Sequence, residues 1–566
     1  MAGLAWHRET DVLVVGSGAG GMAAALAASY AGLDVVVAEK SEFFGGSTAV
    51  SGGAVWIPEN HHMASVGHSD SRGSVWRYLE QTLGNRLQRD LVEAYLDAGP
   101  RMVEFMERNT AVRFVARAYS PDYESNLEGA SLGGRTIDPA PFDGRELGSH
   151  FTSLRPPLHT FVALGGMMVG RKDIDNLLSS YKSLPAFFAS LKLVGRHVSD
   201  RLRYPRGTRL ILGNALAARL LKSALDRDIA LKLQTEVRDL IVQQGRVVGA
   251  DLSSNGTSER VRVRKAVVLA AGGTPQSARW RSENVPFASV HHSMAPSGNV
   301  GDGIRLGLSA GGAVQTDGAQ GAFLTPVSVL RSKDGAVTAF PHLVMDRQKP
   351  GLIAVNSSGR RFANEGTSYH AFVESMYRSH DTVPSIPSFL ICDANFIRKY
   401  GFGLARPGPY VHGHLVKAGY LIREPTLERL AQTIGVDPAA LAETVENNNR
   451  YAEQGHDPEF GKGSIEYNRY LGDPLHKPNP CLGPIAKAPF YAVRVWPGDI
   501  GSALGLKTDP RGRVLGEDGE PVPGLYACGN DMNSIMAGNY PAAGITLGPA
   551  LTFGYIAGCD IAGRAP

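Results

Sequence analysis

The pattern of apolar residues predicts a βαβ unit at the start of the chain. Residues 11–15 form a continuous β-branched run, which is typical of a strand buried on both faces. An Ala-rich helical segment follows and is expected to end near Ala31, because Gly32 stops it. Residues 33–39 then form a second apolar run. Parallel strands joined by a helix indicate a doubly wound α/β sheet.

A second α/β stretch is predicted in the second quarter of the sequence. Residues 215–228 have the apolar spacing of a helix, and 230–235 have that of a strand. Residues 236–242 and 246–252 are expected to pair as a hairpin. A buried strand over 266–273 then ends in glycines, so this stretch adds strands to the same type of sheet.

The region that follows has a different character, with Pro-containing, aromatic and polar loops and a helical segment near 426–453. We interpret it as an inserted α+β catalytic cap domain that binds the substrate. From Gly524 onward a strand followed by glycines returns, and the chain closes with a helix over about 547–563. The fold class is therefore α/β, with a discontinuous Rossmann-like domain around the cap. The expected segments are 1–284 and 481–566 for the Rossmann-like domain and 285–480 for the cap.

Composition narrows the class of protein. At 566 residues the chain is long enough for more than one core, because single cores stop growing near ~250–300 residues. The net charge of +4 comes without a clustered basic stripe, so nothing indicates a nucleic-acid partner. The four cysteines (Cys392, Cys481, Cys528 and Cys559) lie far apart and have no His at metal spacing, so we expect neither a disulfide framework nor a metal site.

The distribution of apolar residues predicts a cytoplasmic protein. No apolar signal core precedes the first strand, and no apolar run reaches the ~20 residues of a membrane-spanning helix. Residues 157–195 are rich in Leu, Phe and Met with interspersed basic residues. We expect them to pack inside the domain. The alternative is an amphipathic surface that touches lipid, as a peripheral membrane contact, or admits an apolar substrate.

A glycine motif in the first βαβ unit predicts a dinucleotide site. The run Gly16-Ser-Gly18-Ala-Gly-Gly21 follows a strand and opens a helix, which is the context in which this pattern has meaning. Gly16 permits the turn, Gly18 lets a pyrophosphate approach the backbone, and Gly21 lets helix and strand pack closely. The helix N-terminus offers N–H groups and a positive dipole end to the phosphates. Glu39, at the end of the second strand, can accept the ribose hydroxyls.

A second glycine-rich stretch favours FAD over NAD. Residues 45–53 contain Gly-Gly pairs together with Ser47, Thr48 and Ser51, directly after Glu39. NAD needs no such stretch so soon, whereas the ribityl chain and isoalloxazine of FAD extend past the pyrophosphate and need close backbone contacts. FAD is therefore the expected cofactor.

Later glycine-terminated strands support the same interpretation. Ala271-Gly272-Gly273 and Cys528-Gly529-Asn530 each end an apolar strand, where open α/β sheets bind ligands. Near the C-terminus a helix begins with Pro549 in its first turn. Its N-terminus is expected to stabilise negative charge on a reduced flavin.

These motifs resemble 3-ketosteroid Δ1-dehydrogenase and its relatives in the fumarate reductase/succinate dehydrogenase flavoprotein superfamily. The resemblance covers nearly the whole chain, and the C-terminal segment that bears a tyrosine is its most specific part. It rests on residues 11–22, 39–40, 45–48, 51–58, 298–303, 356–365, 497–501, 523–530 and 540–555. The cofactor-binding candidates are Gly16, Gly18, Ala19, Gly20, Gly21, Glu39, Lys40, Gly46, Ser47, Thr48, Ser51, Gly52, Gly53, Val237, Gly272, Asn530 and Leu547.

The resemblance implies that the protein introduces a C=C bond next to a ring ketone. Tyr540 and the backbone N–H of Gly544 match the positions that hold the carbonyl oxygen, as a small oxyanion hole. Tyr369 matches the base that takes the α-proton, while flavin N5 takes the β-hydrogen as hydride. Because a phenol has a pKa near ~10, the base needs a partner phenol or a positive potential. Tyr123 is the expected partner, with Tyr119 as the alternative.

Two departures from the family pattern affect the expected substrate. Ser368 stands before the base tyrosine where the family has Pro, and His370 follows it, where it could tune or relay a proton. Ala542 and Ala543 replace the usual Pro and Gly. Smaller cyclic ketones of the cyclohexanone type are therefore an alternative to steroids.

Two other functions would require different residues at these positions. A fumarate-type enoate reductase would clamp its dicarboxylate with arginines at the two places where this chain has Tyr369 and Tyr540. A flavin-binding protein without catalysis would not need the two placed tyrosines. No second dinucleotide motif is evident, so electrons are expected to leave to a quinone or another acceptor.

Overall fold

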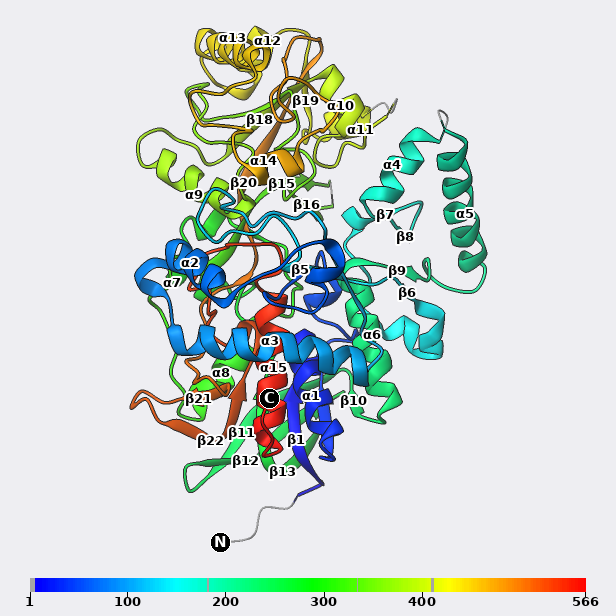
Figure 1. Cartoon of the computed structure of the whole chain (residues 1–566), viewed down its shortest axis with the longest axis vertical. Helices are drawn as coiled ribbons and strands as arrows, with labels where there is room; N and C mark the ends of the chain where they lie inside the picture. Colours follow the sequence, from blue (N-terminus) through cyan, green and yellow to red (C-terminus); the bar gives the residue numbers. More distant parts are fainter. Residues whose placement is uncertain (1–5, 181–182, 333, 409–411) are drawn as a thin grey trace.

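The computed structural model describes residues 6–180, 183–332, 334–408 and 412–566. Figure 1 shows two lobes stacked along the long axis and a helical arm at one side. The lobe that contains both described chain ends is built on an eight-stranded sheet. Its parallel part has the order β10 (Ala230–Lys232), β2 (Val35–Ala38), β1 (Arg8–Val15), β13 (Thr257–Leu269) and β22 (Pro521–Ala527). The short β21 (Arg513–Leu515) pairs with β22.

The antiparallel part of this sheet extends the predicted hairpin. Strand β11 (Thr235–Gln243) pairs with β12 (Arg246–Ser254), and β12 then pairs with the first half of β13. The buried strand predicted over 266–273 is therefore the last part of a longer strand, which begins at Thr257 and ends at Leu269. Within it, residues 261–264 alternate buried Val with exposed Arg, because only one face of the strand is buried there.

Helices cover this sheet closely because glycines line their contacts. Helix α1 (Ala19–Tyr30) packs against α15 (Leu547–Ile561), and a Cβ at Gly554 would lie 2.2 Å from the carbonyl oxygen of Gly20. Helix α3 (Arg89–Asn109) packs on α15, and α6 (Leu212–Asp226) packs on α1. The predicted βαβ unit and closing helix are thus present in the structure.

The second lobe is built on a seven-stranded sheet. Its main path is β16 (Val337–Pro341), β15 (Ala322–Arg331), β20 (Phe490–Ser502), β18 (Ser388–Asp393) and β17 (Leu352–Val355). Strands β14 (His292–Ser293) and β19 (Ile422–Glu424) also pair with β20. Helix α9 (Tyr369–His380) packs on β15.

Two details of this lobe differ from the sequence interpretation. The helical segment near 426–453 is two helices, α12 (Leu427–Ile434) and α13 (Pro438–Gln454), because Gly435 and Pro438 interrupt it. Strand β20 lies at the centre of the second sheet, although its residues follow position 480. The predicted division into 1–284, 285–480 and 481–566 stays a proposal.

A small three-stranded sheet lies between the lobes and supports the site described below. It has the order β3 (Val55–Trp56), β5 (Thr136–Pro139) and β4 (Phe114–Ala116). The guanidinium of Arg135, the residue before β5, lies 5.8 Å from the ring centroid of Tyr78 in helix α2 (Arg72–Leu83).

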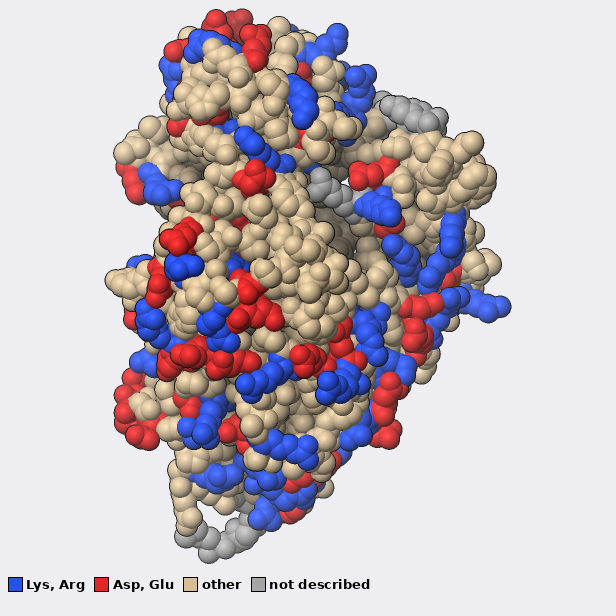
Figure 2. All heavy atoms as spheres, viewed as in Figure 1, with Lys and Arg blue, Asp and Glu red and all other residues tan. Residues whose placement is uncertain are grey.

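Helices α4 (Arg171–Ser179) and α5 (Leu184–Arg201) form the arm at the side of the molecule (Figure 1). They contact each other, and the exposed apolar side chains of α5 include Leu184, Phe187, Phe188 and Leu191. Within the described ranges, no helix is both long enough and apolar enough to cross a bilayer. Lys, Arg, Asp and Glu are interspersed over the face in Figure 2.

Candidate active site

One large cavity, of about 1850 Å³, brings the predicted site residues together. It begins at the carboxyl ends of the parallel strands and is lined by residues of both lobes and of the arm. This is where open α/β sheets bind ligands. Pockets for one drug-sized ligand are ~300–1,000 Å³, so the cavity has room for an extended cofactor and a second molecule.

The first glycine motif forms the floor of the cavity. Gly16 has a φ of +104°, and a Cβ there would lie 2.3 Å from the carbonyl oxygen of Ala270. A Cβ at Gly18 would meet no atom closer than Thr48 Oγ1 at 3.8 Å, so the space beside Gly18 is open. Gly21 does not line the cavity. Its Cβ position lies 2.3 Å from the oxygen of Gly16, which agrees with a role in helix–strand packing.

An acidic residue stands at the end of β2, as the sequence indicated. Glu39 Oε2 accepts hydrogen bonds from the Ser17 hydroxyl at 2.7 Å and the Ser17 N–H at 3.1 Å. Its other oxygen accepts from the N–H of Ser41 at 2.9 Å. These contacts hold the carboxylate at the cavity wall, where Arg155 adds a cation that the sequence interpretation missed.

The second glycine stretch lies against the first. Thr48 Oγ1 accepts from the N–H of Ala19 at 2.9 Å, and Ser47 Oγ accepts from Asn299 Nδ2 at 2.9 Å. A Cβ at Gly52 would meet no atom within 4 Å, so open space lies beside this backbone too. Asn299 was missed as a site residue, although it lies in the family-like run 298–303. Lys40 forms an ion pair with Asp302 at the cavity wall.

The glycines that end β13 and β22 meet around a buried carboxylate. Asp531 accepts from the N–H groups of Ala271 and Gly273, and burial raises its pKa to about 6. Neighbouring Gly272, Asn530 and Leu547 line the cavity, as does Val237 from β11. Asp531 thus fixes the loop after β13.

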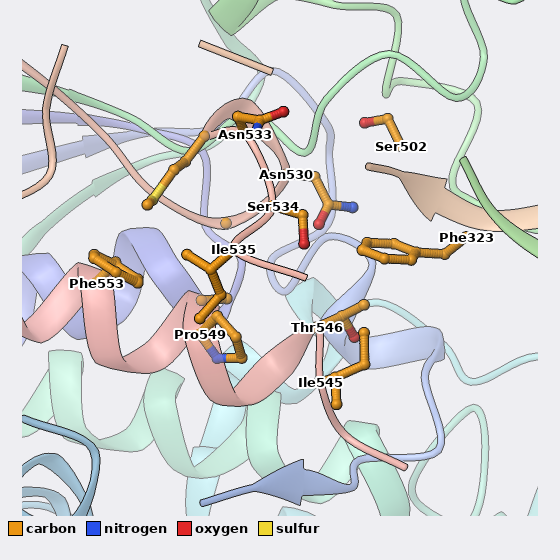
Figure 3. Close-up of a pocket in the computed structure, with 13 residues that line it drawn as sticks. Phe323, Ser502, Asn530, Asn533, Ser534, Ile535, Ile545, Thr546, Pro549 and Phe553 are labelled. Carbon is orange, nitrogen blue, oxygen red and sulfur yellow. The ribbon is translucent and has the colours of Figure 1, made fainter. Parts of the chain in front are cut away.

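A small pocket of about 20 Å³, lined by both apolar and polar residues, adjoins this end of the cavity (Figure 3). Asn530 and Ser534 lie above the start of α15, which carries Pro549. Asn533 Oδ1 is buried there and has no hydrogen-bond partner among the described residues. A volume of ~10–15 Å³ suffices for one water molecule, so this pocket is large enough to hold one.

A network of buried charges positions Tyr369 at the start of α9. Arg361 pairs with Glu365 and Asp457 at 2.9 Å, and Glu365 also accepts from the N–H of Ala354. The guanidinium of Arg347 donates to the carbonyls of Glu365 and Thr367. Ser368 caps the helix by accepting from the N–H of Ala371, so the residue next to it, Tyr369, has a fixed orientation.

Tyr540 and Gly544 lie in a loop whose carbonyls are tied to neighbouring elements. The oxygen of Pro541 accepts from the Tyr123 N–H at 2.8 Å and from the Tyr78 hydroxyl at 2.6 Å. The oxygen of Gly544 accepts from the Trp56 N–H at 3.2 Å. Within the described residues, no hydrogen bond uses the N–H of Gly544. This N–H lines the cavity as a free donor.

Three phenols converge beside this loop. The hydroxyls of Tyr123 and Tyr369 are 3.1 Å apart, and the Tyr369 and Tyr540 ring centroids are 5.1 Å apart. The rings of Tyr123 and Tyr540 are stacked at 5.7 Å. Tyr119, the alternative partner, is exposed and hydrogen-bonds Glu466 at 2.5 Å. The geometry therefore favours Tyr123.

Burial controls the protonation of these phenols. It raises the pKa of both Tyr123 and Tyr369 well above the ordinary value, and the neighbouring phenols raise that of Tyr369 further. Burial also raises the pKa of Tyr540, although hydrogen bonds with Tyr369 and Thr546 oppose this shift. All three are protonated near neutrality, so Tyr540 is a hydrogen-bond donor, and removing the proton of Tyr369 is costly.

His370 is a neutral residue behind this cluster. Burial lowers its pKa to about 3. Its Nδ1 accepts the N–H of Leu324 at 3.0 Å, so the proton resides on Nε2, which lies 3.7 Å from Glu374. The ring centroid is 6.1 Å from that of Tyr540. His370 therefore packs beside Tyr540 without changing charge at physiological pH.

The cavity fits FAD on its own features. Three features lie along one continuous space. The backbones at Gly18 and Gly52 are open to close approach. The Glu39 carboxylate is an acceptor, and the free N–H of Gly544 is a donor. Apart from Gly21, all the cofactor-binding candidates line it, together with Tyr123, Tyr369, Tyr540 and Gly544. This set defines a flavoprotein with a second binding region beside its cofactor site.

Comparisons with known proteins agree with this class. The FAD binding domain family matches residues 11–547. A 4-oxocyclohex-2-ene-1-carboxylate 5-dehydrogenase of Sinomonas cyclohexanicum is 40% identical over 98% of this chain and 93% of its own length. A 3-oxosteroid 1-dehydrogenase of Mycolicibacterium smegmatis is 34% identical over 99% of this chain and 98% of its own length.

The fold is shared with a solved relative. The crystal structure of 3-ketosteroid Δ1-dehydrogenase from Sterolibacterium denitrificans, in complex with 1,4-androstadiene-3,17-dione, has a TM-score of 0.90 and 38% identity over 98% of this chain and all of that one. The chain belongs to the FAD-binding family, in the group of 3-ketosteroid Δ1-dehydrogenase-like flavoproteins. It is an FAD-dependent oxidoreductase that acts on CH–CH groups.

Proposed function

We propose that the protein removes two hydrogens from adjacent ring carbons next to a ketone, giving an α,β-unsaturated ketone. The observation that carries this proposal is the meeting of three buried phenols and the free N–H of Gly544 in the cavity that also contains the dinucleotide glycines. A carbonyl oxygen at Tyr540 and Gly544 would receive two hydrogen bonds. Such donors stabilise the enolate as it forms.

Each tyrosine then has a distinct task. Tyr540 donates to the carbonyl oxygen and makes the α-proton more acidic. Tyr369 acts in its deprotonated form: after its own proton has left to solvent, its phenolate oxygen accepts the α-proton. The Tyr123 hydroxyl, which donates to this oxygen, stabilises the phenolate. Bound FAD supplies the two-electron acceptor for the hydrogen that leaves the β-carbon. The acceptor that takes the electrons onward is proposed to be a quinone or another carrier.

The substrate is proposed to be a 3-ketosteroid, with a smaller cyclic ketone as the second candidate. The steroid is favoured by the similarity to 3-oxosteroid 1-dehydrogenases and by the size of the cavity. The smaller ketone is favoured by the 40% identical relative, whose name gives a 4-oxocyclohexene carboxylate as substrate. Fumarate-type reduction is disfavoured because a dicarboxylate needs a free guanidinium. Arg117, a cation near the tyrosines, already donates to both carboxylate oxygens of Asp138, each at 2.7 Å.

Anaerobic mixing of the FAD-loaded protein with a ketone panel tests the proposal. We expect 4-androstene-3,17-dione or 4-oxocyclohexanecarboxylate to bleach the flavin absorbance and to yield a product lighter by two hydrogens. Comparing initial bleaching rates ranks the two substrate classes. If neither ketone bleaches the flavin and fumarate reoxidises the pre-reduced protein, the proposal is wrong.

We also propose that the arm contacts a membrane surface at the rim of the cavity. Ile174, Leu177 and Leu178 of α4 line the cavity, whereas Leu184, Phe187, Phe188 and Leu191 of α5 recur at helical spacing and are exposed. Lys192 and Arg201 of α5 are exposed as well. A helix with this distribution binds anionic lipid surfaces.

Vesicle sedimentation tests this contact. Replacing both Phe187 and Phe188 with Ser should lower binding to anionic vesicles by ~10-fold or more, because each buried aromatic ring contributes ~1.5–3 kcal/mol. Val337→Ser, at another exposed apolar position, is the control. Equal sedimentation of the wild type and the double variant would contradict the contact.

A further inference from the structure

Two histidines and a glutamate converge outside the cavity. His61 and His62 lie in the turn that follows β3, and Glu107 lies near the end of α3. Glu107 Oε2 is 3.0 Å from the Nε2 of His61 and 2.9 Å from the Nε2 of His62. The two imidazole centroids are 4.1 Å apart. Among the described residues, no other group of three His, Cys, Asp or Glu side chains meets in this way.

This arrangement matches the ligand set of a transition-metal ion. The candidate ligand atoms all lie within 4.8 Å of one another. Zn²⁺ binds imidazole nitrogen at ~2.0–2.1 Å and carboxylate oxygen at ~2.0–2.2 Å, which places tetrahedral ligands ~3.3 Å apart. The distance from Glu107 Oε2 to each Nε2 is within a few tenths of an ångström of this value. Two imidazoles favour Zn²⁺, Co²⁺, Ni²⁺ or Cu²⁺ over Mg²⁺ and Ca²⁺, which prefer oxygen ligands.

The ligands are held in place from behind. Glu107 Oε1 accepts the N–H of Phe114 at 2.8 Å, which leaves Oε2 directed at the rings. Asn60 is buried. Its side-chain amide donates to the carbonyls of Ile57 and Gly134, and its Oδ1 accepts a hydrogen bond from the backbone N–H of His62 at 3.1 Å. Such outer contacts orient ligands and raise metal affinity.

A divalent ion would engage a lone pair of each Nε2 and the Glu107 carboxylate together. The side chain of His61 is 42% exposed, so an ion can enter from solvent and keep one position for water.

We propose that His61, His62 and Glu107 bind one divalent transition-metal ion such as Zn²⁺. The ion joins the turn after β3 to α3. This site lies outside the proposed reaction, so it carries no catalytic step. Because β3 supplies the Trp56 N–H that holds the Gly544 carbonyl, the ion stabilises a segment on which the active-site loop rests.

The test uses the untagged, FAD-loaded full chain after treatment with a chelator. Titration with Zn²⁺ by calorimetry should show one equivalent bound and a rise in Tm. Binding of Co²⁺ should add visible absorption bands in a difference spectrum against the flavin. His62→Ala and Glu107→Gln should each lower Zn²⁺ affinity by at least ~10-fold and remove the rise in Tm.

The matched control is His150→Ala, which removes an exposed histidine outside the cluster and should leave Zn²⁺ affinity unchanged. If His62→Ala fails to fold, anomalous diffraction from crystals of the wild type soaked in Zn²⁺ locates the ion directly. A wild-type protein that binds no Zn²⁺, a Zn²⁺ affinity unaffected by both cluster variants, or an anomalous peak elsewhere would overturn the proposal.

Discussion

Replacing Tyr540 with phenylalanine should lower the rate of flavin reduction by a ring ketone by ~10²–10³-fold, because one donor to the developing enolate is lost. The ring should keep its place, since its contacts with Tyr123 and Phe323 are made by ring atoms. FAD should therefore remain bound, and its absorbance per protein should match that of the wild type. Anaerobic stopped-flow measurement of flavin bleaching gives the rate.

Tyr467→Phe provides a matched control. This tyrosine lines the same cavity, and its ring lies 4.5 Å from that of Tyr123, but it has no assigned role in the reaction. Its loss of a hydroxyl should change the rate by less than ~10-fold. Full activity of Tyr540→Phe, or an equal loss in both variants, would remove the role assigned to Tyr540.

The parts of the fold that depend on local sequence were the parts that could be predicted. The first βαβ unit, the helix predicted over 215–228 and the closing helix follow from apolar spacing and from glycines at the ends of elements. The second of these is observed as Leu212–Asp226. Gly21 is an example at the level of a single residue. Its position in the glycine motif predicts close helix–strand packing, and the space around its Cβ position agrees with this role. By contrast, the division into α12 and α13 depends on how strongly Gly435 and Pro438 interrupt a long apolar pattern.

Contacts between distant residues could not be read from the sequence. Asn299 holds Ser47 across 252 positions, and Asp531 bonds the N–H of Gly273 across 258. Neither lies in a spacing that indicates a ligand by itself. The same limit applies to β20, which pairs with strands far from it in sequence. It applies as well to the histidine cluster, because Glu107 is 45 residues from His62. The tyrosines were found only because a family resemblance supplied their roles.

Replacing Tyr369 with phenylalanine should have the largest effect on the reaction. General bases contribute ~10²–10⁴-fold, and no other side chain is placed to take over from this hydroxyl in the proposed scheme. The ring would keep its place at the start of α9, because Ser368 still caps the helix. Flavin reduction by the ketone should fall by that factor, while FAD binding should not change.

The pH dependence gives this prediction a second readout. Burial and the neighbouring phenols raise the pKa of Tyr369 well above its ordinary value, and a base acts in its deprotonated form. The fraction of active enzyme therefore increases as pH rises, so the wild-type bleaching rate should climb across the neutral and alkaline range. Tyr369→Phe should lose this slope, whereas Tyr467→Phe should retain it. A slope that persists in Tyr369→Phe would assign the base to another group, because a residue that is absent cannot be the one that titrates.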